Sequence, residues 1–209
     1  MASEHLNVWQ EVAEATNDIV TPGNVLDVVG FGASIYGLRK LDSWKGIAAT
    51  AAGFMTDVVD GKVARTTKTQ SPLGEAVDAA GDKVKLAIAL YKIWDLDLAP
   101  RPLLSAVAIQ NATNVALVAV DRMRHGEPQL HSSSHGKKAM FLEQWGLGLH
   151  VIGSQVYKTN ERRGYLIKRA ATVLTLAGLT YGIAATIGYA QTLETVSYTH
   201  LTLPTNREV

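Results

Sequence analysis

Four aspartates stand in two close pairs within one short segment of the chain, Asp57 with Asp60 and Asp78 with Asp82. Residues three or four positions apart lie on one face of a helix, with β-carbons about 5–6 Å apart, so each pair would form an acidic patch. Two carboxylates about 5 Å apart repel by roughly 3 kcal/mol at an effective dielectric of 20. Clustered carboxylates suit Mg²⁺, Mn²⁺ or Ca²⁺ better than Zn²⁺, so the pairs predict a divalent-metal site. The nearest cations in the sequence are Lys62, Arg65 and Lys83.

Two apolar runs must position these pairs, because residues 46–59 end at the first pair and residues 76–94 begin at the second. If both runs are helices joined by a polar loop over residues 60–75, the acidic patches face each other at one end of a hairpin. All four carboxylates would then share one site.

The chain holds four further apolar runs, at residues 25–38, 103–120, 139–156 and 170–190. Strand signals are weak, so we expect an all-α fold, a six-transmembrane-helix bundle. A membrane-spanning helix needs about 20 mainly apolar residues, and only the runs at 103–120 and 170–190 approach that length without their flanks. The mean hydropathy of +0.06 is low for such a protein. A soluble helical module with an acidic hairpin is therefore the alternative.

The ends of the chain differ from its middle. Residues 1–20 are predicted to form an amphipathic juxtamembrane helix, since Leu6, Trp9 and Val12 fall on one stripe. A break around Pro22 separates it from a six-helix domain over residues 21–193. Residues 194–209 are predicted to be a non-native or disordered tail, because their composition resembles a translated sequencing adaptor. The 20 basic and 19 acidic residues argue against a nucleic-acid partner, and the absence of cysteine excludes a disulfide framework.

Written as a pattern, the acidic segment reads D-x2-D-G-x2-A-R-x8-G-x3-D-x3-D. Eight residue types at fixed spacing make a far more specific signal than a single glycine motif. The pattern resembles the signature of the CDP-alcohol phosphatidyltransferase family, and it is matched without a gap. Its fixed positions are Asp57, Asp60, Gly61, Ala64, Arg65, Gly74, Asp78 and Asp82.

The resemblance implies a multi-pass phospholipid-biosynthesis enzyme of the cell (inner) membrane, with its active site facing the cytoplasm. Such an enzyme transfers a phosphatidyl group from CDP-diacylglycerol to a small alcohol and releases CMP. It also implies two Mg²⁺ or Mn²⁺ ions and a possible homodimer. The loop Lys and Arg residues are divided almost evenly, with a slight excess opposite the motif, so the positive-inside rule alone leans weakly toward the other orientation. A metal-dependent membrane transporter is an alternative, although it would not need the Gly-x2-Ala-Arg insert.

The resemblance also assigns roles to individual residues. Asp57, Asp60 and Asp78 would hold the metals, and Asp82 would be the general base that also touches one metal. Asn24 could contact the nucleotide or could instead cap the following helix. The full set implied to bind the nucleotide is Asn24, Asp57, Asp60, Gly61, Ala64, Arg65 and Gly74.

The acceptor must be read from residues outside the motif. The segment His135-Gly136-Lys137-Lys138 resembles the Gly-Lys segment of a phosphatidylglycerophosphate synthase-like branch, which uses glycerol 3-phosphate. The chain departs from that branch farther on, where Glu143 replaces a glutamine. An inositol phosphate or another alcohol is therefore the alternative acceptor. The candidate ligands of the acceptor phosphate are Arg122, Arg124, Lys137 and Lys138, whose charges could instead be membrane-flanking.

Overall fold

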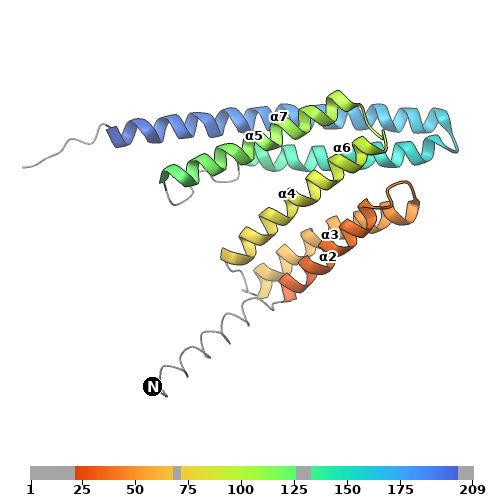
Figure 1. The fold of residues 1–209 in the computed structure, drawn as a ribbon, viewed down its shortest axis with the longest axis horizontal. Helices are drawn as coiled ribbons and strands as arrows, with labels where there is room; N and C mark the ends of the chain where they lie inside the picture. Colours follow the sequence, from red (N-terminus) through yellow and green to blue (C-terminus); the bar gives the residue numbers. More distant parts are fainter. Residues whose placement is uncertain (1–21, 68–71, 126–132, 202–209) are drawn as a thin grey trace, which may run out of the picture. The chain divides into compact units, whose positions relative to one another are not determined.

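The computed structural model describes residues 22–67, 72–125 and 133–201, with side chains for residues 28–56, 81–124 and 133–193. These residues form six α-helices and no strand, which confirms the all-α prediction (Figure 1). The chain divides into two compact units, Met1–Leu96 and Asp97–Val209. The helices are α2 (Pro22–Leu38), α3 (Trp44–Thr67), α4 (Pro72–Asp95), α5 (Arg101–His125), α6 (Ser134–Tyr157) and α7 (Glu161–Leu201).

In the first unit, α2 and α3 form a closely packed antiparallel hairpin. Ser43 caps the N-terminus of α3, because its hydroxyl accepts a hydrogen bond from Gly46 N at 3.1 Å and satisfies a free helix N–H. A side chain at Gly53 would collide with Ser34 on α2, so glycine there permits the close approach of the helices. The third helix, α4, packs on α2.

In the second unit, α6 and α7 form a longer antiparallel hairpin, visible as two neighbouring ribbons in Figure 1. Asn160 lies just before α7 and accepts a hydrogen bond from Arg163 N at 3.0 Å through its side-chain oxygen. Helix α5 packs on α7, where Thr186 donates a hydrogen bond of 2.6 Å to Asn114. A polar contact therefore helps to join two helices of this unit.

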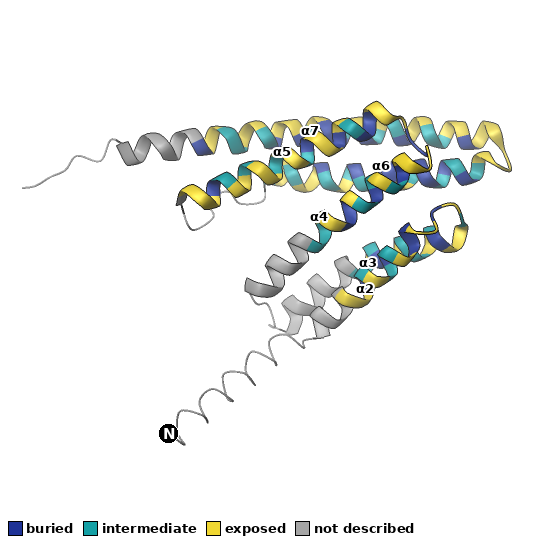
Figure 2. Cartoon of the chain, in the orientation of Figure 1, coloured by how far each residue is buried: buried dark blue, intermediate teal, exposed yellow. Residues whose placement is uncertain are grey.

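Two helices in the described part of the chain are long and apolar enough to cross a membrane, α5 over Arg101–Arg124 and α7 over Glu161–Leu193. They correspond to the two runs that approach spanning length in the sequence. Only 22% of the α5 window and 33% of the α7 window is buried, and Figure 2 shows exposed positions along both helices. Side chains such as Ile109 and Ile183 are more than half exposed, as expected of lipid-facing residues rather than of a soluble core. The other predicted spans are not confirmed by length and apolarity.

Several predicted helix ends are wrong because polar residues continue the helices. Helix α3 runs on to Thr67 and α4 begins at Pro72, so the predicted loop over residues 60–75 is mostly helical. Lys, Arg and Ala in that stretch are good helix formers, and proline suits the first position of a helix. Helix α7 likewise begins at Glu161 and continues to Leu201, into the region predicted to be a tail. The predicted N-terminal helix over residues 1–20 lies outside the described residues.

Candidate active site

The motif aspartates all lie within helices of the first unit, rather than beside a long loop. Asp57 and Asp60 are three residues apart on α3, and Asp78 and Asp82 are four apart on α4. The helical backbone therefore gives each pair the spacing that places two residues on one face. Of the four, only Asp82 belongs to the residues whose side chains are described.

Asp82 forms an ion pair with a lysine on its own helix. The Oδ1 atom of Asp82 lies 3.0 Å from Nζ of Lys85, three residues later, and the lysine side chain is 3% exposed against 23% for the aspartate. A lysine is rarely so buried unless an opposite charge accompanies it. The aspartate therefore occupies a partly buried position beside a fixed positive charge.

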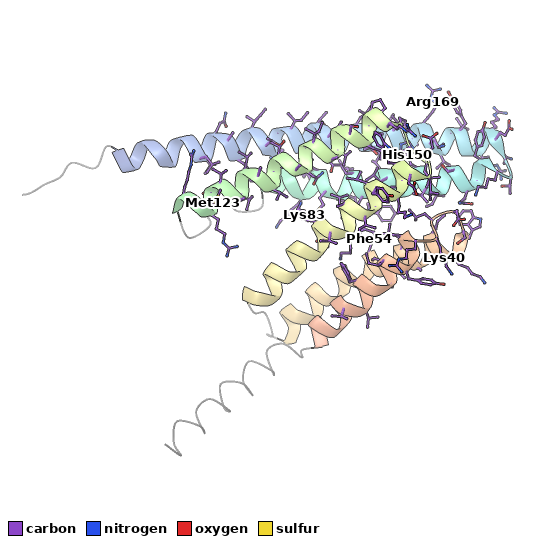
Figure 3. The ribbon with its side chains drawn as sticks, in the orientation of Figure 1. Lys40, Phe54, Lys83, Met123, His150 and Arg169 are labelled. Carbon is purple, nitrogen blue, oxygen red and sulfur yellow. The ribbon has the colours of Figure 1, made fainter. Side chains whose placement is uncertain are left out.

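The same turn of α4 contacts both other helices of the unit. The Lys85 ammonium lies 5.9 Å from the ring centroid of Phe54 on α3, within the range of a cation–π interaction. Figure 3 labels Phe54, together with the exposed Lys83 of α4. A β-carbon at Gly81 would lie 3.9 Å from the Phe31 ring on α2, an ordinary packing distance. Since Phe54 precedes Asp57 by three residues, this contact brings the Asp82 turn close to the start of the α3 motif.

Lys85 is the functional candidate that the sequence analysis missed. The cations nearest to the aspartates in sequence are Lys62, Arg65 and Lys83. Lys83 is exposed and does not share the buried position of Lys85. The i,i+3 spacing from Asp82 to Lys85 was the available signal, because such residues are neighbours on a helix surface.

The described residues do not test the predicted metal site. Among the side chains that the structure describes, no three His, Cys, Asp or Glu residues gather as a metal site. Asp57, Asp60 and Asp78 lie outside that set, so the complete ligand group stays a prediction. What is described fits a divalent cation in one respect, because Asp82 supplies a carboxylate oxygen donor of the kind that Mg²⁺ and Mn²⁺ prefer.

The residues implied to bind the nucleotide are placed by backbone alone. Gly61, Ala64 and Arg65 lie on α3, and Gly74 lies in the first turn of α4. Asn24 is the third residue of α2, so the alternative that it caps this helix is wrong, since a cap precedes the first helical residue. The nucleotide roles of all these residues stay predictions.

The four basic candidates for the acceptor lie on helix ends of the second unit rather than in a loop. Arg122 and Arg124 belong to the last turn of α5, whereas Lys137 and Lys138 belong to the start of α6, and all four are exposed. The two lysines line a shallow surface pocket of about 390 Å³ between α6 and α7; its other lining residues are Phe141, Leu142 and Tyr181.

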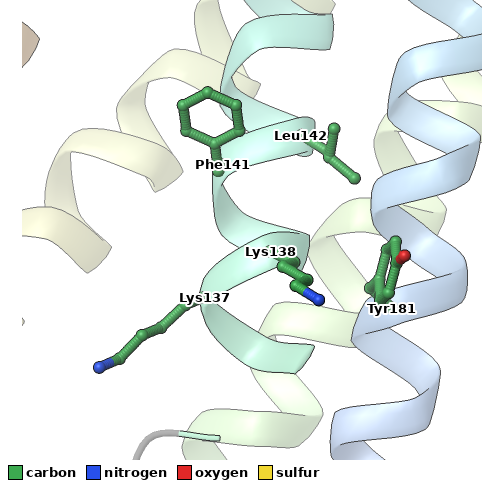
Figure 4. A pocket seen from close by; sticks show the side chains of 5 residues that line it. All are labelled: Lys137, Lys138, Phe141, Leu142 and Tyr181. Carbon is green, nitrogen blue, oxygen red and sulfur yellow. The ribbon is translucent and has the colours of Figure 1, made fainter. Parts of the chain in front are cut away.

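Figure 4 shows Lys138 directed toward Tyr181 and Lys137 directed away from it. The Lys138 ammonium lies 5.6 Å from the Tyr181 ring centroid. Arg122 and Arg124 are not among the lining residues, so the structure brings together only half of the predicted basic set. Tyr181 was not predicted, because it lies in an apolar run more than 40 residues after the lysines.

A fully buried carboxylate occurs in the second unit, at Glu143. Glu143 on α6 is 2% exposed, and its Oε2 accepts a hydrogen bond of 2.9 Å from the Asn111 amide on α5. The same amide donates to Gln110 Oε1 at 2.9 Å. Glu143, which stands in place of a glutamine of the glycerophosphate-using branch, is thus part of an amide network between helices.

Comparison with known proteins bears on the motif and on the fold together. The family model described as CDP-alcohol phosphatidyltransferase matches residues 16–184, a range that contains α2 to α6 and more than half of α7. A comparison with individual curated proteins finds no match. The family match covers most of the chain and includes every fixed position of the aspartate motif. The chain therefore belongs to the CDP-alcohol phosphatidyltransferase family, whose members are phosphotransferases that move a substituted phosphate group from a CDP-alcohol to an acceptor.

Proposed function

We propose that this protein is a membrane enzyme that transfers the phosphatidyl group of CDP-diacylglycerol to glycerol 3-phosphate and releases CMP. The observation that carries the proposal is the ungapped aspartate motif, whose last aspartate lies partly buried in a helical unit beside a cation. Family membership supports the reaction type, and the Gly136-Lys137 segment supports a phosphorylated acceptor.

The proposed reaction forms one bond and breaks one. The acceptor hydroxyl oxygen bonds to the phosphatidyl phosphorus, and the bond from that phosphorus to the bridging oxygen breaks, so that CMP leaves with the bridging oxygen. Asp82 takes the hydroxyl proton, because an alcohol needs a base within hydrogen-bond reach to become an effective nucleophile. Gly61, Ala64 and Gly74 leave space for the nucleotide, while the Arg65 guanidinium faces its phosphates.

Two divalent ions, held by Asp57, Asp60, Asp78 and Asp82, would neutralise the diphosphate when bound and stabilise charge on the entering and leaving oxygens. Mg²⁺ and Mn²⁺ are the candidates, since the proposed ligands are all carboxylates.

We propose that the protein spans the bilayer and presents the motif to the cytoplasm. The apolar, exposed windows of α5 and α7 support a membrane location. A cytoplasmic site would meet a water-soluble acceptor, and a homodimer is compatible with the proposal. The candidate phosphate ligands at the helix ends, Arg122, Arg124, Lys137 and Lys138, would bind the acceptor phosphate, and the pocket beside Tyr181 favours the two lysines.

The decisive experiment measures CMP release from CDP-diacylglycerol by the purified full chain in mixed detergent micelles with Mg²⁺. The acceptors compared are glycerol 3-phosphate, an inositol phosphate, free inositol and serine, with EDTA as the control. We expect turnover with glycerol 3-phosphate and none with EDTA. Faster turnover with an inositol phosphate would replace the acceptor, and absence of CMP with every alcohol would favour a transporter and contradict the enzyme.

A further inference from the structure

Lys85 occupies an unusual position for a helical lysine. Its side chain is 3% exposed, although lysine normally extends its ammonium group into water. It belongs to none of the fixed motif positions, and the proposed chemistry does not use it. We infer that Lys85 is a positioning residue, which holds the Asp82 carboxylate in the orientation needed for transfer; this inference rests on the proposed role of Asp82.

The same helix contains a matched pair that shows what an ordinary ion pair looks like here. Lys92 and Asp95 are also three residues apart on α4, and Nζ of Lys92 lies 3.4 Å from Oδ2 of Asp95. Their side chains are 29% and 47% exposed, so water competes for both charges and the pair contributes little. The Asp82–Lys85 pair is shorter and far more buried, so its charges interact more strongly.

Burial of the Lys85 charge carries an energetic cost. Removing a charge from water costs several kcal/mol, and Lys85 is 3% exposed while Asp82 keeps 23% exposure. Both charges of the ion pair lie on α4. A local cost of this kind is typical of functional positions.

Contacts on two sides fix the turn that carries the pair. The Phe54 ring of α3 lies below the Lys85 ammonium, and the Phe31 ring of α2 lies beside Gly81. With the ammonium held in this way, one carboxylate oxygen of Asp82 is anchored at 3.0 Å. A carboxylate that is already anchored loses less conformational freedom on forming a hydrogen bond to the substrate hydroxyl than a free carboxylate does. Misplacement of a reacting group by about 1 Å can lower the rate about 100-fold.

The test compares Lys85→Met, Lys85→Arg and the matched control Lys92→Met in the full chain, by steady-state CMP release. We expect Lys85→Met to lower kcat by about 10- to 100-fold with little change in KM for CDP-diacylglycerol, because substrate binding does not require the anchor. Lys85→Arg keeps the charge and should recover most of the lost kcat. Lys92→Met should match the wild type.

Binding of Mn²⁺, followed by electron paramagnetic resonance without substrate, gives a second readout. The Lys85→Met variant lacks the ammonium charge beside Asp82. Its affinity for Mn²⁺ should be unchanged or higher, since the ammonium group repels the metal ion. A folded Lys85→Met variant with wild-type kcat, or one with weakened Mn²⁺ binding, would overturn the inference. If the methionine variant does not fold, the arginine variant decides, because a folded Lys85→Arg protein without activity would also overturn it.

The wild type separates this inference from the function on which it rests. If the wild type releases CMP and Asp82→Asn does not, an unaffected Lys85→Met variant refutes only the positioning role. If the wild type releases no CMP with any alcohol, the proposed function and the positioning role are both wrong.

Discussion

Each unit has a carboxylate shielded from water on a helix, partly at Asp82 and fully at Glu143, and the two carboxylates have different partners. In the first unit, Asp82 faces the Lys85 ammonium on its own helix. In the second unit, Glu143 of α6 accepts a hydrogen bond from the Asn111 amide of α5. The first carboxylate is therefore paired with a charge on its own helix, whereas the second is hydrogen-bonded to a neighbouring helix.

This difference separates function from packing. The Asn111–Glu143 bond joins neighbouring helices, and Gly178 of α7 lies close enough to Glu143 that any side chain there would collide with it. Such a network fixes how helices dock, especially where α5 is apolar enough to cross a membrane. The Asp82–Lys85 ion pair lies within α4 and carries a motif residue, so we propose that it serves chemistry. Exchanging or deleting single groups in the two clusters tests this division.

The largest effect is expected for Asp82→Asn, which removes the base and keeps the shape of the side chain. Transfer should fall by at least about 100-fold, because general base catalysis contributes about that factor or more. Donor and metal binding should remain largely intact, because the other three proposed ligands, Asp57, Asp60 and Asp78, are unchanged. CMP release, donor binding and thermal unfolding are the measurements, with Glu143→Gln as the matched carboxylate-to-amide control. Full activity of Asp82→Asn would refute the assignment of the base.

A large loss of stability, without a specific loss of chemistry, is expected for Gly178→Val. A β-carbon there would lie 2.8 Å from Cγ and 2.9 Å from the backbone N of Glu143, and the backbone cannot easily move away. Overpacking of this kind costs about 1–3 kcal/mol of unfolding free energy. Thermal unfolding in detergent measures it. Gly188→Val on the same helix is the control, because no described neighbour lies within 4 Å of its β-carbon. Equal melting temperatures for the two variants would contradict the close packing around Glu143.

The sequence predicted the helices well where apolar runs define them, and poorly where polar residues extend them. The stretch from Lys62 to Thr67 reads as loop because it is charged, yet it continues α3 because its residues favour helix. The polar start of α7 is helical for the same reason, and Glu161 also suits the positive end of the helix dipole. Hydrophobicity therefore located the helices, while helix propensity and capping determined their ends.

The candidate site was predictable in its motif and not in its surroundings. Fixed spacing identified Asp82 from one short segment. The pairing with Lys85 required knowing that α4 is already helical at Asp82, and the burial of Lys85 required the packing of α3 around Phe54. Tyr181 could not be linked to Lys138 from sequence, because that contact depends on how α6 and α7 align.

A smaller effect is expected for Asn111→Leu, which removes the amide of the second cluster while keeping a similar volume. The loss should be about 1 kcal/mol, since hydrogen bonds between membrane helices average about 0.6 kcal/mol and a buried acceptor loses its donor. Activity per folded molecule should not change. Thr113→Val on the exposed side of α5 is the control, because its hydroxyl bonds only within the helix, to Ile109 O at 2.8 Å. If folded Asn111→Leu selectively lost CMP release, the Asn111–Glu143 cluster would have a role in function and not only in packing.

The smallest effect is expected for Gly81→Ala, beside Asp82. The added β-carbon would lie 3.9 Å from the Phe31 ring, which is ordinary contact, and alanine favours a helix over glycine by up to about 1 kcal/mol. We therefore expect a slightly raised unfolding temperature and unchanged transfer. Gly32→Ala on α2 has no described neighbour within 4 Å of its β-carbon, so it measures the propensity term alone. If Gly81→Ala gains stability but loses transfer, the Asp82 turn needs the open space itself, and the site would extend along α4 toward the space between Asp78 and Asp82.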